Sequence, residues 1–401
     1  MVGLSFASQA TILPAFAAHL GAPNVVIGAI PAVMTLGWFL PSLFAAGHTE
    51  ALSRKLPFVL RYTVWERVPF FVLALAAFVV AERAPALVLG VLLTLLLVIT
   101  GVGGVLMPAW MDVVGRAIPV TLRGRFFAAS NLAAAAAGFA GSFLSAHVLA
   151  TMPAPASFGV CFLCASACMA LSYAALALVR EPAATASSPP VALRTYLGRI
   201  PPLLRRDANL RRFLVARAFA VVSVMGGGFY TVYALSTWEA PPAQAGVFTT
   251  LLLAGQIAGN VTLGWLADRM GHRLVIVAAM IGANALALGA SSLGAFGVVF
   301  VLAGVQGAAV SISNLSVLLE FAPAPEEQPT YVGLGTTLMA PVAFGAPLAA
   351  GLLADAFGFA AVFLIAAVAG AVALAVLVSF VRDPRQGWRV ARDERERGVS
   401  G

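Results

Sequence analysis

Residues 240–273 read APPAQAGVFTTLLLAGQIAGNVTLGWLADRMGHR, and residues 22–55 read APNVVIGAIPAVMTLGWFLPSLFAAGHTEALSRK. The two stretches start 218 residues apart (240 minus 22), and in both an Ala-Pro loop leads into an apolar helix that ends in a charged turn. The residues that match at this offset are Ala22 with Ala240, Pro23 with Pro241, Gly28 with Gly246, and Gly37 with Gly255. A repeat of this kind indicates that one structural unit occurs twice in the chain.

The composition around this repeat is that of a membrane protein. Of the 401 residues, 61% are hydrophobic and only 10% are charged, which leaves too little polar surface to cover a soluble protein. The apolar runs are continuous, so they predict membrane helices and exclude a barrel, whose strands would alternate in polarity over about ten residues. With about 20 residues per crossing, this length accommodates about twelve helices.

Twelve apolar spans can be assigned along the chain, six in each half. The spans of the first half are 2–20, 25–46, 66–82, 85–108, 126–149 and 157–179. The spans of the second half are 212–236, 245–266, 274–292, 295–319, 331–354 and 358–381. The sequence therefore predicts an all-α membrane protein of twelve transmembrane helices in two six-helix repeats.

Four segments follow from this assignment. Residues 1–180 form an N-terminal six-helix bundle and residues 212–381 a C-terminal one. Residues 181–211 begin Pro- and Ser-rich and become basic, which predicts a cytoplasmic linker with a partly interfacial helix. Residues 382–401 form a cytoplasmic tail.

Basic residues set the predicted orientation. Of the 24 Lys and Arg, only Arg83 falls in an outward loop if the N-terminus is inside. The other assigned positions, all inward, are Arg54, Lys55, Arg61, Arg116, Arg123, Arg125, Arg194, Arg199, Arg205, Arg206, Arg211, Arg269, Arg273 and the tail from Arg382 to Arg397. The formal charge of +8 thus reflects topology and not nucleic-acid binding. We expect a multi-pass protein of the cell inner membrane with both termini in the cytoplasm.

Because an even number of helices separates the copies, the halves are parallel repeats related by an axis along the membrane normal. That symmetry predicts a cavity between the halves at mid-membrane, opened to either side by rocking. The turn 264–273, GWLADRMGHR, resembles the loop signature of the major facilitator superfamily: Gly, any residue, Leu, Ala, Asp, Arg, any residue, Gly, Arg or His, Arg or Lys. The span count and the repeat extend the resemblance over nearly the whole chain, and it implies a transporter.

The loop signature predicts a conformational latch on the cytoplasmic side. Asp268 is expected to face the start of the fifth span, and Glu50 the start of the eleventh, so that both contacts cross between the halves. The first copy is degenerate, because Ala46 and Ser53 replace its glycines. The residues assigned to the latch are Gly264, Asp268, Arg269, Gly271, Arg273, Glu50, Arg54, Lys55, Arg123 and Arg125. Ordinary inward positive charge is the alternative explanation for the basic ones.

Neutral polar residues at mid-membrane depth are the candidate solute contacts. Amides in lipid are costly unless they are bonded, so most should face the bundle interior. The set is Gln9, Asn131, Tyr230, Tyr233, Gln256, Asn260, Gln306 and Asn314. Interhelical bonding is the alternative for each amide. Tyr230 and Tyr233, beside Gly226 to Gly228, are the favoured pair, and such a lining suits a neutral, zwitterionic or weakly amphipathic solute.

No catalytic residue, metal ligand set or nucleotide-binding loop is recognisable in the spans, so we expect neither an enzyme nor a cofactor. Cys161, Cys164 and Cys168 share a helical face without His, Asp or Glu, which favours packing over metal binding. The expected partners are a small-molecule solute and the lipid bilayer, with the monomer as the functional unit. A transporter-like membrane sensor that moves no solute is the alternative function.

Overall fold

The computed structural model describes residues 2–50, 52, 54–118, 120–181, 200–270, 282–321 and 328–381. Within them the chain is helical and contains no strand. Nine helical segments in this part are long and apolar enough to cross a bilayer, and Leu293–Ala309 is a shorter apolar helix. The predicted all-α membrane fold is confirmed.

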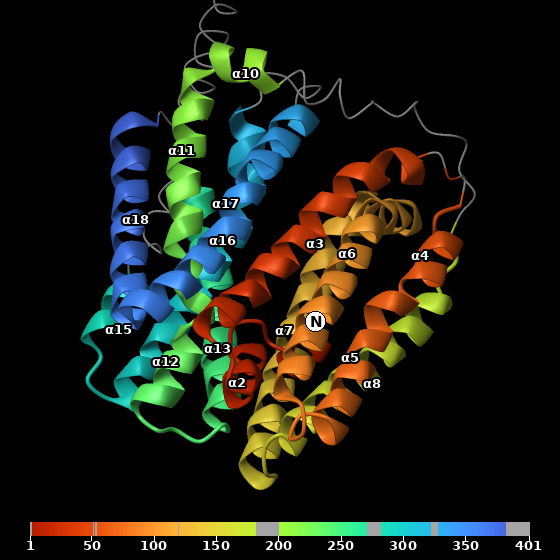
Figure 1. Cartoon of the computed structure of the whole chain (residues 1–401). Helices are drawn as coiled ribbons and strands as arrows, with labels where there is room; N and C mark the ends of the chain where they lie inside the picture. Colours follow the sequence, from red (N-terminus) through yellow and green to blue (C-terminus); the bar gives the residue numbers. More distant parts are fainter. Residues whose placement is uncertain are drawn as a thin grey trace, which may run out of the picture.

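The described part of the first half groups into six helical segments, five of which contain one of the nine spans. They are formed by α1 and α2 (Val2–Ser5 and Ile12–His19), α3 (Asn24–Glu50), α4 and α5 (Leu56–Tyr62 and Val64–Val79), α6 (Pro85–Ala117), α7 (Val120–Thr151) and α8 (Ala156–Ala177). Figure 1 shows these helices, coloured red to yellow, gathered on one side of the molecule.

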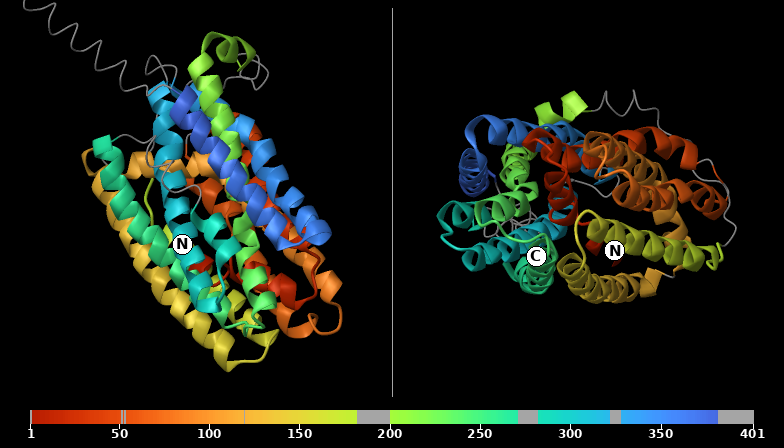
Figure 2. Two further views of the ribbon diagram at one scale, coloured as in Figure 1. Left: turned by 90° about the vertical axis from the view of Figure 1, so that its left-hand side faces the viewer. Right: turned by 60° about the horizontal axis from the view of Figure 1, so that its bottom comes forward.

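The second half repeats the arrangement. It is formed by α11, η1 and α12 (Ala208–Ser223, Met225–Gly228 and Tyr230–Thr237), α13 (Gln244–Met270), α15 (Gly282–Gly289), α16 (Leu293–Phe321), α17 (Gln328–Phe357) and α18 (Phe359–Phe380). The short helix α10 (Ile200–Arg206) lies in the predicted linker. The two halves stand side by side in both figures (Figures 1 and 2).

The two ends of the molecule can be named from these elements. We call the end that carries Glu50, Leu56 and α10 the linker end; the sequence predicts that it faces the cytoplasm. We call the other end, with the loops 20–23, 80–84, 152–155 and 238–243, the far end.

Three spans differ from the sequence prediction. The first and the seventh were expected to be continuous, but residues 6–11 separate α1 from α2, and residues 224–229 separate α11 from α12. The third span was expected to begin at 66, yet α4 already begins at Leu56 and places Arg61 within a helix. The two breaks could not be predicted, because apolar periodicity indicates the extent of a span but not a break within it. The earlier start of the third span is possible because a long arginine side chain such as that of Arg61 can reach the headgroups from inside a helix.

The offset of 218 residues predicts the break in the second half from that in the first. Shifted by 218, the gap 6–11 becomes 224–229, and α2 becomes residues 230–237, the bounds of α12. The repeat is therefore confirmed at the level of helix ends.

The matched glycines lie where helices approach one another most closely. A Cβ on Gly37 would collide with Thr100 of α6, and a Cβ on Gly255 with the backbone of Val301 of α16. These pairs join α3 to α6 and α13 to α16 within each half. Without a side chain, the two backbones can pack tightly in a medium that offers no hydrophobic driving force between helices.

Candidate functional site

The breaks in the first and seventh spans are the candidate functional site. Non-helical backbone at membrane depth is tolerated only where it is buried in protein or lines a water-filled space, because lipid cannot satisfy its polar groups. Each break is paired with a polar side chain that bonds a freed carbonyl.

At the second-half break, Asn284 of α15 bridges the two helix pieces. Its Nδ2 donates to the carbonyl oxygen of Ser223, the last residue of α11, at 2.8 Å. Its Oδ1 accepts the hydroxyl of Tyr230, the first residue of α12, at 2.6 Å. Asn284 is fully buried, so both bonds form away from water and fix the geometry of the break.

At the first-half break, the bonding partner comes from the other half. Thr231 Oγ1 donates to the carbonyl oxygen of Ala10 at 2.9 Å, and the hydroxyls of Thr11 and Thr249 lie 2.5 Å apart. The two breaks are thus linked directly, through the residue that follows Tyr230.

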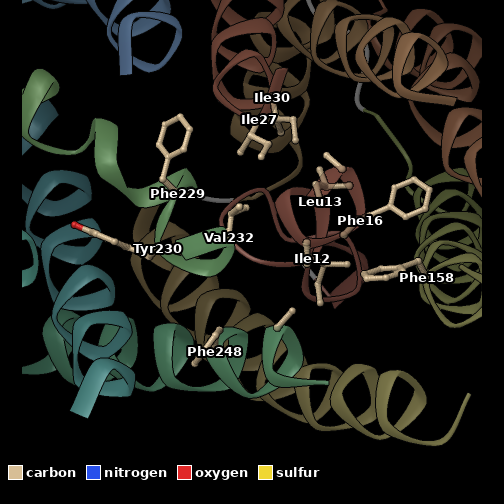
Figure 3. Close-up of a cluster of buried hydrophobic side chains, with 14 of the residues drawn as sticks. Ile12, Leu13, Phe16, Ile27, Ile30, Phe158, Phe229, Tyr230, Val232 and Phe248 are labelled. Atoms are coloured by element: carbon tan, nitrogen blue, oxygen red, sulfur yellow. The ribbon is translucent and has the colours of Figure 1, made fainter. Parts of the chain in front are cut away.

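Tyr230 packs within the second half, and its role as a solute contact stays a prediction. Its ring is 2% exposed and contacts Phe296, Phe300 and Phe363. Figure 3 shows it directed away from α2, whereas Val232 points toward α2. The sequence identifies the residue but not its direction, because that depends on how the helix resumes after the break.

The other predicted solute contacts are distributed over several elements. Gln9 is exposed within the first break, Gln256 is half-buried and Asn260 exposed on α13, and none of the three makes a hydrogen bond in the described part of the chain. Tyr233 is half-buried and packs against Trp238, Phe296, Phe359 and Phe363, and Gln306 is buried on α16. The side chains of Asn131 and Asn314 lie outside the described set.

A contact that the sequence did not suggest joins the halves at the far end. Asp355 of α17 accepts the backbone N–H of Asn24 on Oδ1 and that of Val25 on Oδ2, each at 3.0 Å. These are the first two residues of α3, whose N–H groups have no partner within the helix. A carboxylate of one half therefore caps a helix of the other.

Glycines bring the halves together at two further crossings of the far end. A Cβ on Gly28 of α3 would collide with the carbonyl oxygen of Pro347 of α17, and a Cβ on Gly246 of α13 with the backbone of Ala146 of α7. Beside the second crossing, the hydroxyls of Ser142 and Thr250 lie 2.8 Å apart. We call the α3–α17 crossing the first seam and the α7–α13 crossing the second seam. Because Gly28 and Gly246 are equivalent positions of the repeat, the two seams are symmetry counterparts.

The latch predicted at the linker end stays a prediction, because most of its side chains lie outside the described part of the chain. Gly271 and Arg273 lie outside the described residues. Of Glu50, Arg123, Arg125, Gly264, Asp268 and Arg269 only the helical backbone is described. Nearby, Glu181 accepts the backbone N–H groups of Lys55 and Leu56 at 2.8–3.0 Å, a contact within the first half. Arg54 is exposed.

Comparison with known proteins agrees with this architecture. Residues 233–400 match the sequence profile described as Major Facilitator Superfamily. No curated protein sequence matches the chain.

Solved transporter structures share the fold over nearly the whole chain. A point mutant of the nucleoside transporter NupG superposes with a TM-score of 0.74 at 12% identity, covering 95% of this chain and 97% of its own. The xylose transporter XylE from E. coli gives a TM-score of 0.66 at 12% identity, with 95% and 96% covered. A POT family transporter in complex with 5-aminolevulinic acid gives 0.67 at 14% identity, with 96% and 95% covered.

The second half therefore resembles the major facilitator superfamily in sequence, and nearly the whole chain shares the fold of the solved transporters.

Proposed function

We propose that the protein moves a small organic solute across a cell membrane by alternating access between its two halves. The supporting observation is the set of contacts at the far end, where the halves meet through the α3–α17 and α7–α13 crossings and the Asp355 cap. These contacts close one end of the interface, as an inward-facing state requires.

The chemistry of the contacts supports a reversible closure. They consist of glycine crossings, hydroxyl pairs and one carboxylate cap, each of which contributes about 0.5–2 kcal/mol. A two-state equilibrium shifts from 1:99 to 99:1 with about 5.5 kcal/mol, so several such contacts can bias one state without making it permanent.

The mid-membrane elements support a site for a neutral or weakly charged solute. Gln9 lies exposed in the first break, and Gln256 and Asn260 leave amides without partners in the described structure. The structural relatives carry the names of nucleoside, xylose and POT family transporters, which supports a small polar organic molecule as solute. The predicted linker-end latch, the cytoplasmic termini and the monomeric state belong to this proposal.

A disulfide across the second seam tests the proposal. In a chain whose cysteines 161, 164 and 168 are replaced by serine, Ser142→Cys and Thr250→Cys bring two thiols together where hydroxyls now lie 2.8 Å apart. Uptake is measured in proteoliposomes, with and without a pH gradient, against a panel of small neutral, zwitterionic and monoanionic solutes.

The parent should move at least one solute, the oxidised double variant none, and reduction should restore uptake. Each single cysteine variant, oxidised in the same way, should retain the parent rate. A parent that moves no solute of the panel, or a cross-linked variant as fast as the parent, would contradict alternating access.

A further inference from the structure

Two helices, one from each half, carry a face that is directed at the break of the opposite half. On α3, Pro31 lies against the second break, since a Cβ on Gly228 would lie 3.8 Å from Cγ of Pro31. On α13, Thr249 lies against the first break, with its hydroxyl 2.5 Å from that of Thr11. Shifted by 218, Pro31 becomes residue 249, so the two faces are equivalents of the repeat. Each face therefore borders the region between the halves.

These two faces become more exposed with distance from the far end. Side chains seven residues apart on a helix point in nearly the same direction, because seven residues make about two turns. On α3 the face runs from half-buried Pro31 to Trp38, which is 41% exposed. On α13 it runs from Thr249, which is 2% exposed, through half-buried Gln256 to exposed Asn260. Because the faces are turned toward the opposite half, we infer that their exposed surface opens to the space between the halves and not to lipid.

The opposite face of α3 gives a contrast. Leu40 is 49% exposed and follows Trp38 by two residues, which places it about 200° around the helix axis. An exposed leucine on the face turned away from the other half suits contact with lipid. Two exposed side chains of one helix thus face different surroundings.

Trp38 and Gln256 hold equivalent positions of the repeat, because residue 38 shifted by 218 becomes residue 256, but their chemistry differs. The ring of Trp38 is held against α6, where a Cβ on Gly103 would lie 3.1 Å from it, and so presents a fixed aromatic surface. Gln256 lies within the span Gln244–Leu263 and makes no hydrogen bond in the described part of the chain. Its amide offers an acceptor and two donors, which are costly to leave unused within a membrane.

We propose that Trp38 and Gln256 are specificity-determining contacts of one solute site between the halves, which takes a small, flat, unsaturated ring bearing an amide-type group. The ring of the solute stacks on Trp38, and its amide-type group bonds to the side chain of Gln256. Figure 3 shows α3, marked by Ile27, and α13, marked by Phe248, on opposite sides of α2, so the two contacts approach the solute from opposite sides. This inference rests on the proposed function and narrows its solute class to neutral cyclic amides with a flat ring.

Thiol labelling tests whether the two positions face water. In the chain without its native cysteines, Trp38→Cys, Gln256→Cys and Leu40→Cys are reconstituted in liposomes and treated with a charged methanethiosulfonate. Trp38→Cys and Gln256→Cys should react about tenfold faster than Leu40→Cys, because only the thiolate reacts and apolar surroundings disfavour it. Reaction of either residue at the rate of Leu40→Cys would overturn the proposal.

Binding to the purified full-length protein tests the solute class. Thermal unfolding is recorded with nicotinamide, with cyclohexanecarboxamide, which lacks the flat ring, and with 3-methylpyridine, which lacks the amide; uracil and dihydrouracil form a second comparison. Nicotinamide or uracil should stabilise the parent by about 2 °C or more, and the matched compounds should stabilise it less. Trp38→Leu should remove the preference for a flat ring, and Gln256→Leu the preference for an amide. Leu40→Ala should keep both preferences.

A parent that does not distinguish nicotinamide or uracil from the matched compounds would overturn the proposal. The same loss of preference in Leu40→Ala as in Trp38→Leu would also overturn it, because it would indicate a general effect on α3. Where Trp38→Leu does not fold, Trp38→Phe replaces it and should keep only part of the preference for a flat ring; an undiminished preference would contradict stacking on Trp38. The disulfide test involves neither Trp38 nor Gln256, so the two proposals can fail separately.

Discussion

At the scale of single residues, the glycines of the repeat have distinct structural roles. Gly37 and Gly255 let two helices of one half meet, whereas Gly28 and Gly246 let a helix meet the other half. The sequence identifies all four as equivalent pairs, but only the structure separates packing within a half from contact between halves.

Gly28→Ala and Gly246→Ala should weaken closure of the far end. The added Cβ has no space against Pro347 or Ala146, and overpacking of this kind costs about 1–3 kcal/mol. A cost near the lower end of that range, about 1.4 kcal/mol, changes the population roughly tenfold. The readout is the alkylation rate of a cysteine at Val232, which is buried and points toward α2 (Figure 3), in the cysteine-free chain. The rate should rise about tenfold. Gly90→Ala, where a Cβ meets nothing within 4 Å, is the control. Equal alkylation rates in all three variants would contradict the role of the two seams in closing the far end.

Asp355→Asn should also weaken closure of the far end, but less than the two glycine substitutions do. An amide can accept only one of the two N–H groups of α3 and carries no charge to offset the positive end of the helix, a loss of about 1 kcal/mol at an exposed site. The same alkylation assay should show a rise of about fivefold. Glu82→Gln removes an exposed acid near the same end and should leave the rate unchanged. A rise in both variants would show that net charge, and not the cap, is responsible.

Tyr230→Phe should destabilise the protein, since it leaves buried Asn284 Oδ1 without its donor at a cost of about 1–3 kcal/mol. Tyr233→Phe, in which no hydroxyl bond of the described structure is lost, should be close to neutral. Thermal unfolding of the purified variants measures both. If Tyr230→Phe were neutral in unfolding while solute uptake fell, the original solute-facing interpretation of Tyr230 would be supported.

At the scale of elements, the sequence predicts the number and extent of helices better than their interior geometry. The spans follow from apolar length, and the repeat offset gives their equivalence. The breaks do not follow, because residues 6–11 contain no proline and only Gly226 to Gly228 mark the second one.

Contacts between distant residues were also beyond sequence reasoning. No sequence pattern singles out Asn284 or Asp355, because their roles depend on which helix stands opposite. The solute contacts were therefore predicted by residue type and depth only, and the direction of a side chain such as Tyr230 could not be predicted.

The second break gives a matched pair of substitutions. A Cβ on Gly226 would lie 2.9 Å from Asn284 Oδ1, whereas one on Gly227 meets nothing within 4 Å. Gly226→Ala should lower stability by about 1–3 kcal/mol, and Gly227→Ala should be neutral or stabilising by about 0.4–1 kcal/mol, because it restricts the unfolded chain. Thermal unfolding compares them directly. Equal effects would show that the Asn284 bridge does not determine the geometry of the break.

At the scale of the whole molecule, the two halves form separate bundles that meet at the far end. Buried residues of one hydrophobic cluster come from both halves there, including Ile12, Leu13, Ile27, Phe229 and Phe248 (Figure 3). The rocking mechanism that we propose requires each half to move as a unit about seams of this kind, which are made by repeat-equivalent helices.

Distances between spin labels on the two halves test this account most directly. One pair, at Glu82 and Glu239, reports on the far end, and the other, at Arg61 and Arg205, reports on the linker end; all four side chains are exposed. The account predicts that Gly28→Ala lengthens the far-end distances and shortens the linker-end distances in the same sample. Distances that stay fixed at both ends, or lengthen at both ends together, would contradict alternating access.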